Sequence, residues 1–119
     1  MKSIKIFVYG TLKKGYALNN ELRDSKFIGN GIIKGYKMYS NGYFPMITKG
    51  DKSNAVTGEI YEVSDEETLR VLDMIEGAYI RTKEKALLTN GQKIDVEVYV
   101  YRYLINDCQK IKTGEWTRN

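Results

Sequence analysis

The chain has 119 residues, an apolar fraction of 42%, a formal net charge of +4 and no histidine. Domains commonly hold about 100–150 residues, so we expect residues 1–119 to form a single domain with its own core. The single cysteine excludes an internal disulfide and, without histidine, a tetrahedral zinc site, so we expect neither a metal nor another cofactor.

Three further features of the sequence limit its function. The usual acid–base residue at neutral pH is missing, so proton transfer in an enzyme of this composition must fall to Glu, Asp, Lys, Tyr or Cys. Lysines and arginines are interspersed with acidic residues, which is typical of a solvated surface and not of a nucleic-acid interface. The first apolar run stops at Gly10, too early for a signal peptide or membrane span. We therefore expect a cytoplasmic protein that binds neither nucleic acid nor membrane.

The N-terminal half of the chain reads as short strands separated by breaker residues. Apolar residues predict a strand over Ile4–Tyr9, which ends in a glycine-bounded loop over residues 10–15. Leu18 and Leu22 lie four residues apart and favour a short helix over Ala17–Arg23. β-Branched and aromatic residues, with a turn signal at Asn41-Gly42, predict the strands that follow: two twisted or bulged strands within Lys26–Ser40, then Phe44–Thr48 and Ala55–Val63.

The main helix is predicted in the second half of the chain. Ser64 as the N-cap and Glu67 three residues later form a capping box, and the acidic residues there suit the positive end of a helix. We expect this helix to run from Ser64 to about Glu76, with Gly77 as the residue that ends it.

A hairpin follows the predicted helix. Asn90-Gly91 is a strong hairpin signal, and it joins strands over Tyr79–Leu88 and Lys93–Leu104. Six or more short strands with one main and one minor helix indicate a closed or nearly closed sheet, because closure removes exposed strand edges. The second hairpin strand should present two faces, formed by Ile94, Val96, Val98 and Val100 on one side and by Asp95, Glu97, Tyr99, Tyr101 and Tyr103 on the other.

The loop Tyr9–Gly15 is the first candidate binding element. Gly10 lets the chain turn sharply after the strand, so that successive backbone N–H groups can point into one concavity and hold a carboxylate or an oxyanion. The alternative is a plain turn with two solvated lysines, Lys13 and Lys14, since glycine often marks only a turn. Spacing alone favours the plain turn.

Glu76 is the candidate acid–base residue. It shares a face of the predicted helix with Leu69 and Leu72, and it lies at the C-terminal end, where the helix dipole disfavours a carboxylate. Both effects should raise the pKa of Glu76 toward the range of a general base. The alternative is a frayed, exposed glutamate, and Glu59 and Glu62 are then the next acids to consider.

Two other residues have weaker claims to a role in chemistry. Arg81 could pair with a substrate carboxylate or with a neighbouring acid, and structural ion pairs are the more common case. Cys108 has no histidine to activate it, so we do not expect it to be a nucleophile.

Taken together, five segments in order along nearly the whole chain resemble the γ-glutamylcyclotransferase-like family. They are Tyr9-Gly10-Thr11-Leu12-Lys13-Lys14-Gly15, Tyr43-Phe44-Pro45-Met46, Val56–Val63 with its Gly-Glu-apolar-Tyr pattern, Leu72–Gly77 followed by Tyr79 and Arg81, and Gly114-Glu115-Trp116.

The resemblance implies an α+β fold, namely a small mixed β-barrel flanked by one main helix and a short helix. It also implies conversion of a γ-glutamyl amide or amine into 5-oxoproline with release of the amine. Compact sequences of this kind are most similar to γ-glutamylaminecyclotransferase, whose leaving amine is an amino-acid side chain. The site residues implied are Glu76 for catalysis and, for binding of the small γ-glutamyl substrate, Tyr9, Gly10, Thr11, Leu12 and Arg81.

Two alternatives to this enzymatic function remain at the level of sequence. The same pocket could bind a small carboxylate-bearing ligand without turnover, as a differently tasked member of the family. A basic RNA-binding barrel is a more distant alternative, which a salt-dependent shift with RNA would support. The sequence fixes neither the leaving amine nor the oligomeric state.

Overall fold

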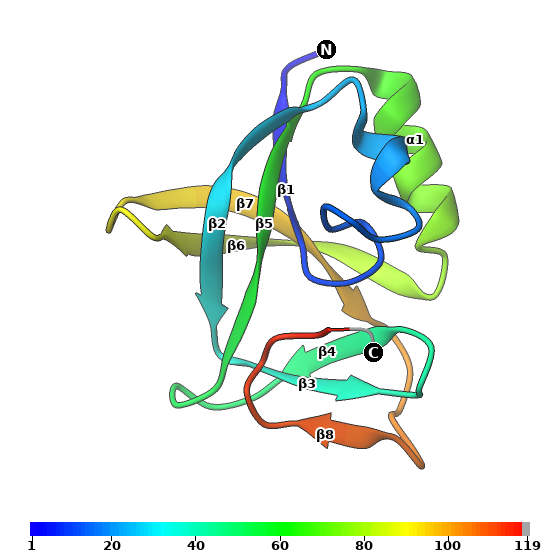
Figure 1. The fold of residues 1–119 in the computed structure, drawn as a ribbon, viewed down its shortest axis with the longest axis vertical. Helices are drawn as coiled ribbons and strands as arrows, with labels where there is room; N and C mark the ends of the chain where they lie inside the picture. The colour runs from blue at the N-terminus through cyan, green and yellow to red at the C-terminus, as the bar shows by residue number, and fades with distance from the viewer. Residues whose placement is uncertain (118–119) are drawn as a thin grey trace.

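The computed structural model describes residues 1–117, and residues 118–119, the end of the predicted domain range, lie outside the described residues. Five strands form a closed barrel in the order β1-β5-β2-β6-β7 (Figure 1). The barrel is mixed, because β1 pairs with β5 antiparallel and with β7 parallel. The strands span Ile4–Val8 (β1), Lys26–Lys34 (β2), Ala55–Val63 (β5), Tyr79–Leu88 (β6) and Lys93–Tyr101 (β7). The predicted small mixed barrel is therefore confirmed.

A second, three-stranded sheet lies below the barrel in the view of Figure 1, with the order β4-β3-β8. Its strands are β3 (Tyr36–Ser40), β4 (Pro45–Lys49) and β8 (Gln109–Ile111). The predicted turn at Asn41-Gly42 joins β3 to β4, with Gly42 at a φ of 97° and the Asn41 side chain accepting the N–H groups of Tyr43 and Phe44. This sheet brings Pro45 to the end of the barrel that carries the candidate site.

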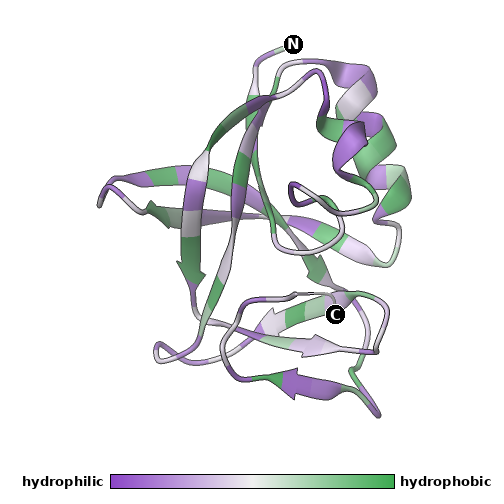
Figure 2. Ribbon diagram, in the orientation of Figure 1, coloured by the Kyte–Doolittle hydropathy of each residue, from purple (hydrophilic) through white to green (hydrophobic). Residues whose placement is uncertain are grey.

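Alternation along the strands separates the barrel interior from its outer surface. Along β1, Phe7 belongs to the interior core, whereas Ile6 and Val8 belong to a second cluster outside the barrel. Figure 2 shows hydrophobic and hydrophilic residues alternating along β7. The predicted inner face of this strand is confirmed, because Val96 and Val98 are buried in the interior core with Ile94 and Val100 packed against it.

The outer cluster is covered by the main helix, α1 (Glu66–Ile75), and by a 3-10 turn, η1 (Asn19–Leu22). Leu72 of α1 and Leu22 of η1 are buried there. The N-cap of the helix lies one residue later than predicted, at Asp65 and not at Ser64. Asp65 has an extended backbone and its carboxylate accepts the N–H groups of Glu67 and Thr68. No helix among residues 1–117 is long and apolar enough to span a membrane.

Two other predicted boundaries were wrong. The short helix is a single turn, because the Leu18 N–H binds the Thr11 carbonyl and Asn19 turns its side-chain amide to the Leu12 carbonyl. The strand β7 ends at Tyr101 and not at Leu104, because Tyr101 lies opposite Tyr79, the first residue of β6, and beyond this pair only the Arg102 N–H still reaches that chain, at the Ala78 carbonyl 3.1 Å away. Tyr103 therefore lies outside the alternation of the strand.

Candidate functional site

A pocket of about 320 Å³ opens where the loop after β1, the end of α1 and the start of β4 meet. Tyr9, Gly10, Thr11, Leu12 and Glu76 all line it. The structure thus brings together these predicted site residues from segments far apart in sequence. The remaining lining is apolar or aromatic: Phe7, Val8, Leu18, Tyr43, Phe44, Pro45, Ile75, Ala78, Tyr79, Tyr99 and Tyr101.

Gly10 allows two of the sequence motifs to touch. A Cβ atom built on Gly10 would lie 2.8 Å from Cγ and 2.9 Å from Cδ of Pro45. Any side chain at position 10 would therefore push the β1 loop away from β4 and open this wall of the pocket. The Tyr79 hydroxyl donates to the Pro45 carbonyl at 2.8 Å and fixes the same wall from β6.

The loop folds as tight turns whose carbonyls are occupied. The Lys13 N–H binds the Gly10 carbonyl at 3.0 Å, and the Leu18 N–H binds the Thr11 carbonyl at 2.9 Å. In contrast, the N–H groups of Gly10, Thr11 and Leu12 make no hydrogen bond within residues 1–117. Strand pairing does not consume these three donors, and they lie in residues that line the pocket.

Polar contacts with β5 and with the C-terminal segment hold the loop in place. Glu59 of β5 accepts the Lys14 N–H at 2.8 Å and the Tyr61 hydroxyl at 3.1 Å. The Lys13 ammonium is buried and donates to the Trp116 carbonyl at 2.6 Å. The Lys14 ammonium lies 5.0 Å from the centre of the Phe27 ring. Both lysines of the predicted plain turn therefore contact other parts of the protein.

Glu76 ends α1 with its side chain half-buried at the pocket. Its N–H binds the Leu72 carbonyl and its carbonyl accepts the Tyr79 N–H, so the backbone on both sides is fixed. Burial raises the pKa of Glu76 to about 7. No hydrogen bond or ion pair to its carboxyl group occurs in the described part of the chain. The sequence-based expectation of a raised pKa is met, through burial.

Three buried or half-buried tyrosines surround this carboxyl group. The Tyr9 hydroxyl donates to the Tyr99 carbonyl at 2.6 Å. Burial and then the charges of Tyr79 and Glu76 raise the pKa of Tyr9, and burial followed by Glu76 raises that of Tyr79. Burial and a hydrogen bond to Asp73 raise the pKa of Tyr99. These phenols stay protonated at neutral pH, which leaves Glu76 as the group in the pocket that can exchange a proton.

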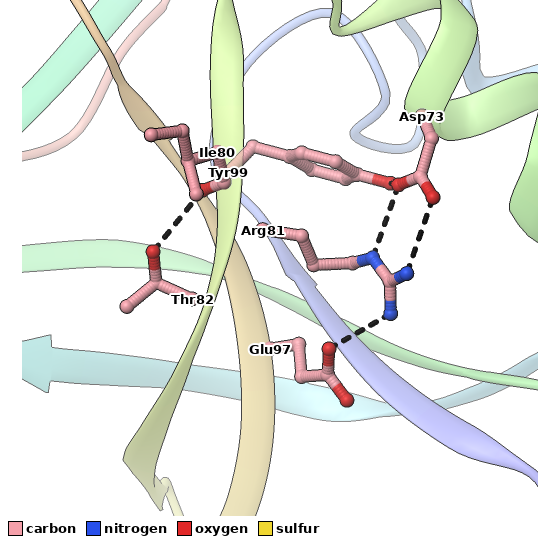
Figure 3. Close-up of polar contacts among 6 residues, drawn as sticks. All are labelled: Asp73, Ile80, Arg81, Thr82, Glu97 and Tyr99. Atoms are coloured by element: carbon pink, nitrogen blue, oxygen red, sulfur yellow. Dashed lines mark hydrogen bonds and ion pairs between the residues drawn. The ribbon is translucent and has the colours of Figure 1, made fainter.

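Arg81 lies outside the pocket lining. Figure 3 shows its guanidinium between Asp73 of α1 and Glu97 of β7, with the Tyr99 hydroxyl beside Asp73. Nε and Nη2 bind the two oxygens of Asp73 at 3.0 and 3.1 Å, and Nη1 binds Glu97 at 2.8 Å. Tyr99 donates to Asp73 at 2.7 Å. Of the two roles considered for Arg81, the geometry matches the ion pair with neighbouring acids.

The other candidates lie away from the pocket. Glu59 supports the loop from behind, and Glu62 accepts the Ser3 hydroxyl at 2.9 Å on the outer surface. Cys108 binds the Asn106 carbonyl at 3.2 Å in the segment before β8. Glu76 is therefore the single carboxylate that lines the pocket among residues 1–117.

Sequence reasoning missed most of the pocket wall. The sequence places the tyrosines of β7 on one face of the strand and predicts no role for them in a site, yet Tyr99 and Tyr101 line the pocket. Tyr43, Phe44 and Pro45 were noticed as a motif without a stated role. One signal could have located the tyrosines of β7. The predicted hairpin pairs Tyr101 with Tyr79, and Tyr79 lies three residues after Glu76 in the sequence.

Comparisons with known proteins agree on one family. The family described as "Gamma-glutamyl cyclotransferase, AIG2-like" matches residues 6–118. A relative from Methanocaldococcus jannaschii, named "Putative gamma-glutamylcyclotransferase MJ1514", is 42% identical over 102 residues, which cover 81% of this chain and 82% of that protein.

Two solved structures show the same fold at 30% sequence identity or more. The crystal structure of protein PH0828 from Pyrococcus horikoshii matches with a TM-score of 0.75 and 30% identity, over 94% of this chain and 88% of that one. The crystal structure of an AIG2-like protein from mouse matches with a TM-score of 0.73 and 32% identity, over 84% of this chain and 78% of the mouse chain.

Proposed function

The chain belongs to the gamma-glutamyl cyclotransferase, AIG2-like family, and from this premise we propose that its pocket binds a γ-glutamyl amine, closes the glutamyl chain into 5-oxoproline and releases the amine. In this reaction the α-amine nitrogen of the substrate attacks its own γ-carbonyl carbon. The bond from that carbon to the leaving nitrogen then breaks. No protein nucleophile is needed, which suits a chain without histidine or an activated cysteine.

The free amides of the loop are proposed to hold the negative charges of the substrate. The N–H groups of Gly10, Thr11 and Leu12 would bind either the α-carboxylate or the oxyanion that forms on the γ-carbonyl. Fixing the folded glutamyl chain converts ring closure into an oriented intramolecular step, which removes much of the entropic barrier.

Glu76 is proposed to carry the protons. Ionised Glu76 takes a proton from the α-ammonium, which frees the nitrogen lone pair for attack. Protonated Glu76 then gives a proton to the leaving nitrogen, and the second proton exchange of each nitrogen occurs with solvent. A pKa of about 7 lets the same carboxyl group accept and donate near neutral pH. This half-buried carboxyl group, without a protein partner in residues 1–117, is the single observation that carries the proposal.

The test is incubation of the purified protein with a panel of γ-glutamyl amines and γ-glutamyl amino acids, with chromatographic detection of 5-oxoproline. We expect 5-oxoproline and free amine in equal amounts from at least one compound. Binding of these compounds with no 5-oxoproline from any of them would favour the non-catalytic alternative, in which Glu76 contacts the ligand only.

A further inference from the structure

We propose that Lys13 is a positioning residue for the reaction. Its ammonium ties the loop after β1 to the C-terminal segment, residues 112–117, and so keeps the free N–H groups of Gly10, Thr11 and Leu12 in place at the pocket. The effect on turnover rests on the proposed function, whereas the effect on the loop itself does not.

The first argument is the burial of Lys13. Its side chain is 7% exposed, and Lys13 is the one charged residue buried to this degree among residues 1–117. The ammonium donates to the Trp116 carbonyl at 2.6 Å and lies 5.3 Å from the centre of the Tyr16 ring. No carboxylate in the described part of the chain forms an ion pair with it. A buried ammonium without an ion pair costs free energy that an apolar side chain of similar length would not, so packing alone does not account for a lysine here.

The second argument is that the acceptor of this hydrogen bond is fixed to the barrel. The Gly114 carbonyl accepts the Thr57 N–H of β5 at 2.8 Å. A Cβ atom built on Gly114 would lie 1.9 Å from the Ala55 carbonyl oxygen, so the C-terminal segment lies directly against β5. Two residues later, the Trp116 side chain is buried in the interior core. The Trp116 carbonyl is therefore a fixed point to which the loop can be tied.

The third argument is the place of Lys13 in the loop. Its N–H closes a turn on the Gly10 carbonyl at 3.0 Å, and its own carbonyl accepts the Tyr16 N–H at 3.0 Å. Thr11 and Leu12 are the two residues inside the turn that Lys13 closes. Lys13 itself does not line the pocket. It therefore acts on the site through the backbone of the turn and not by touching the substrate.

The experiment compares Lys13→Met with wild type by urea denaturation and by hydrogen exchange followed by NMR. We expect a denaturation midpoint close to that of wild type, because the hydrogen bond and the buried charge are removed together. The N–H groups of residues 13 and 18, which bind the Gly10 and Thr11 carbonyls, should exchange at least about tenfold faster. Unchanged exchange at both positions would overturn the inference.

Two further variants serve as controls for this measurement. Lys110→Met removes the same charge at an exposed position of β8 and should leave exchange in the loop as in wild type. Lys13→Arg keeps a charged donor at the same position and should restore most of the protection. An equal increase in exchange for Lys13→Met and Lys110→Met would show an effect of net charge and would overturn the proposed contact.

Turnover gives the functional readout. On a γ-glutamyl amide that wild type converts, we expect kcat/KM of Lys13→Met to fall at least about tenfold, because displaced amides hold the negative charge less well. The pH–rate profile should keep its midpoint, since Glu76 is unchanged, and Lys13→Arg should recover most of the loss. Wild-type kcat/KM in Lys13→Met, or a loss that appears only together with a lower denaturation midpoint, would overturn the positioning role. If wild type forms no 5-oxoproline from any γ-glutamyl compound, the proposed cyclisation fails and the exchange measurement alone decides this inference.

Discussion

At the scale of single residues, the main feature of the site is one carboxyl group whose pKa lies above the value it has in water. Burial at the end of α1 raises the pKa of Glu76 to about 7, while the surrounding phenols are held protonated. Glu76 is half-buried, and its carboxyl group has no hydrogen-bond or ion-pair partner within residues 1–117. Because burial disfavours the charged form, ionisation of Glu76 should lower the free energy of unfolding.

That cost predicts a pH-dependent effect of Glu76→Gln on stability. Between the unfolded pKa near 4.5 and the folded pKa of about 7, the native state binds more protons than the unfolded chain, so the free energy of unfolding falls as pH rises through this window. Glutamine does not ionise. We expect urea denaturation to show the variant more stable than wild type by about 1–3 kcal/mol at pH 8, with the difference shrinking toward pH 4.5.

A matched control for this measurement is Glu66→Gln, an exposed position in the first turn of the same helix. It should give no comparable gain at pH 8. A gain for Glu76→Gln that is the same at both pH values would show that ionisation of Glu76 is not its source.

At the scale of elements, α1 connects to the barrel through the ion pairs in Figure 3. Arg81 of β6 binds Asp73 of the helix and Glu97 of β7, and Tyr99 shares Asp73. Asp73 lies one turn before Glu76, so this network holds the end of the helix at which Glu76 lies. We propose that it positions Glu76, since Arg81 itself does not line the pocket.

Substitution of Arg81 by lysine distinguishes this role from substrate binding. Lysine keeps the charge but cannot reproduce the paired contacts to Asp73 together with the contact to Glu97. We expect a loss of about 1 kcal/mol in the free energy of unfolding, with KM nearly unchanged. Unchanged stability with a large rise in KM would place Arg81 at the substrate.

The start of α1 gives a second test at this scale. Asp65→Ala removes the side chain that accepts two helix N–H groups, so we expect a loss of about 0.5–2 kcal/mol of stability. Ser64→Ala, the substitution at the cap that the sequence predicts, should change stability by less than about 0.5 kcal/mol. A larger effect at Ser64 than at Asp65 in thermal or urea denaturation would contradict the observed cap.

The two possible caps show why the sequence misplaced this boundary. Ser64 and Asp65 are adjacent and both are good caps, and a capping box at Ser64 with Glu67 is equally consistent with the pattern. In the structure Asp65 accepts the Glu67 and Thr68 N–H groups, and Glu67 binds Arg70 instead of the cap. The barrel strands β5 and β6 were predicted with their observed bounds, since clear alternation and flanking turns define them.

At the scale of the whole molecule, the sequence did not predict the contacts between segments that lie far apart along the chain. The parallel pairing of β1 with β7 and the small strand β8 depend on partners far along the chain, which local patterns do not report. The same holds for the contact of Gly10 with Pro45 that closes one pocket wall. Motif and local physics both pointed to Glu76 and the loop, and the structure places them at one pocket, whereas the aromatic part of the pocket wall needed the assembled fold.

Trp116 in the C-terminal segment packs both against the segment after β1 and within the interior core, so we expect its substitution to have a large effect. Trp116 is 4% exposed, belongs to the interior core, and lies 5.2 Å from Tyr16 between ring centres. We expect Trp116→Ala to lower the free energy of unfolding by about 3–5 kcal/mol. Leu104→Ala, at an 88% exposed position, is the control and should change it by less than about 0.5 kcal/mol in urea denaturation. Comparable effects at both positions would contradict this packing.

The turnover of Glu76→Gln on a γ-glutamyl amide that wild type converts is the most direct measure of whether Glu76 moves the protons of cyclisation. Glutamine keeps the shape of the side chain and cannot accept the proton, while the loop that is proposed to bind substrate is untouched. We expect kcat for 5-oxoproline formation to fall by about 10²–10⁴-fold, with KM changing much less. A variant that retains near-wild-type kcat would show that another group carries the protons.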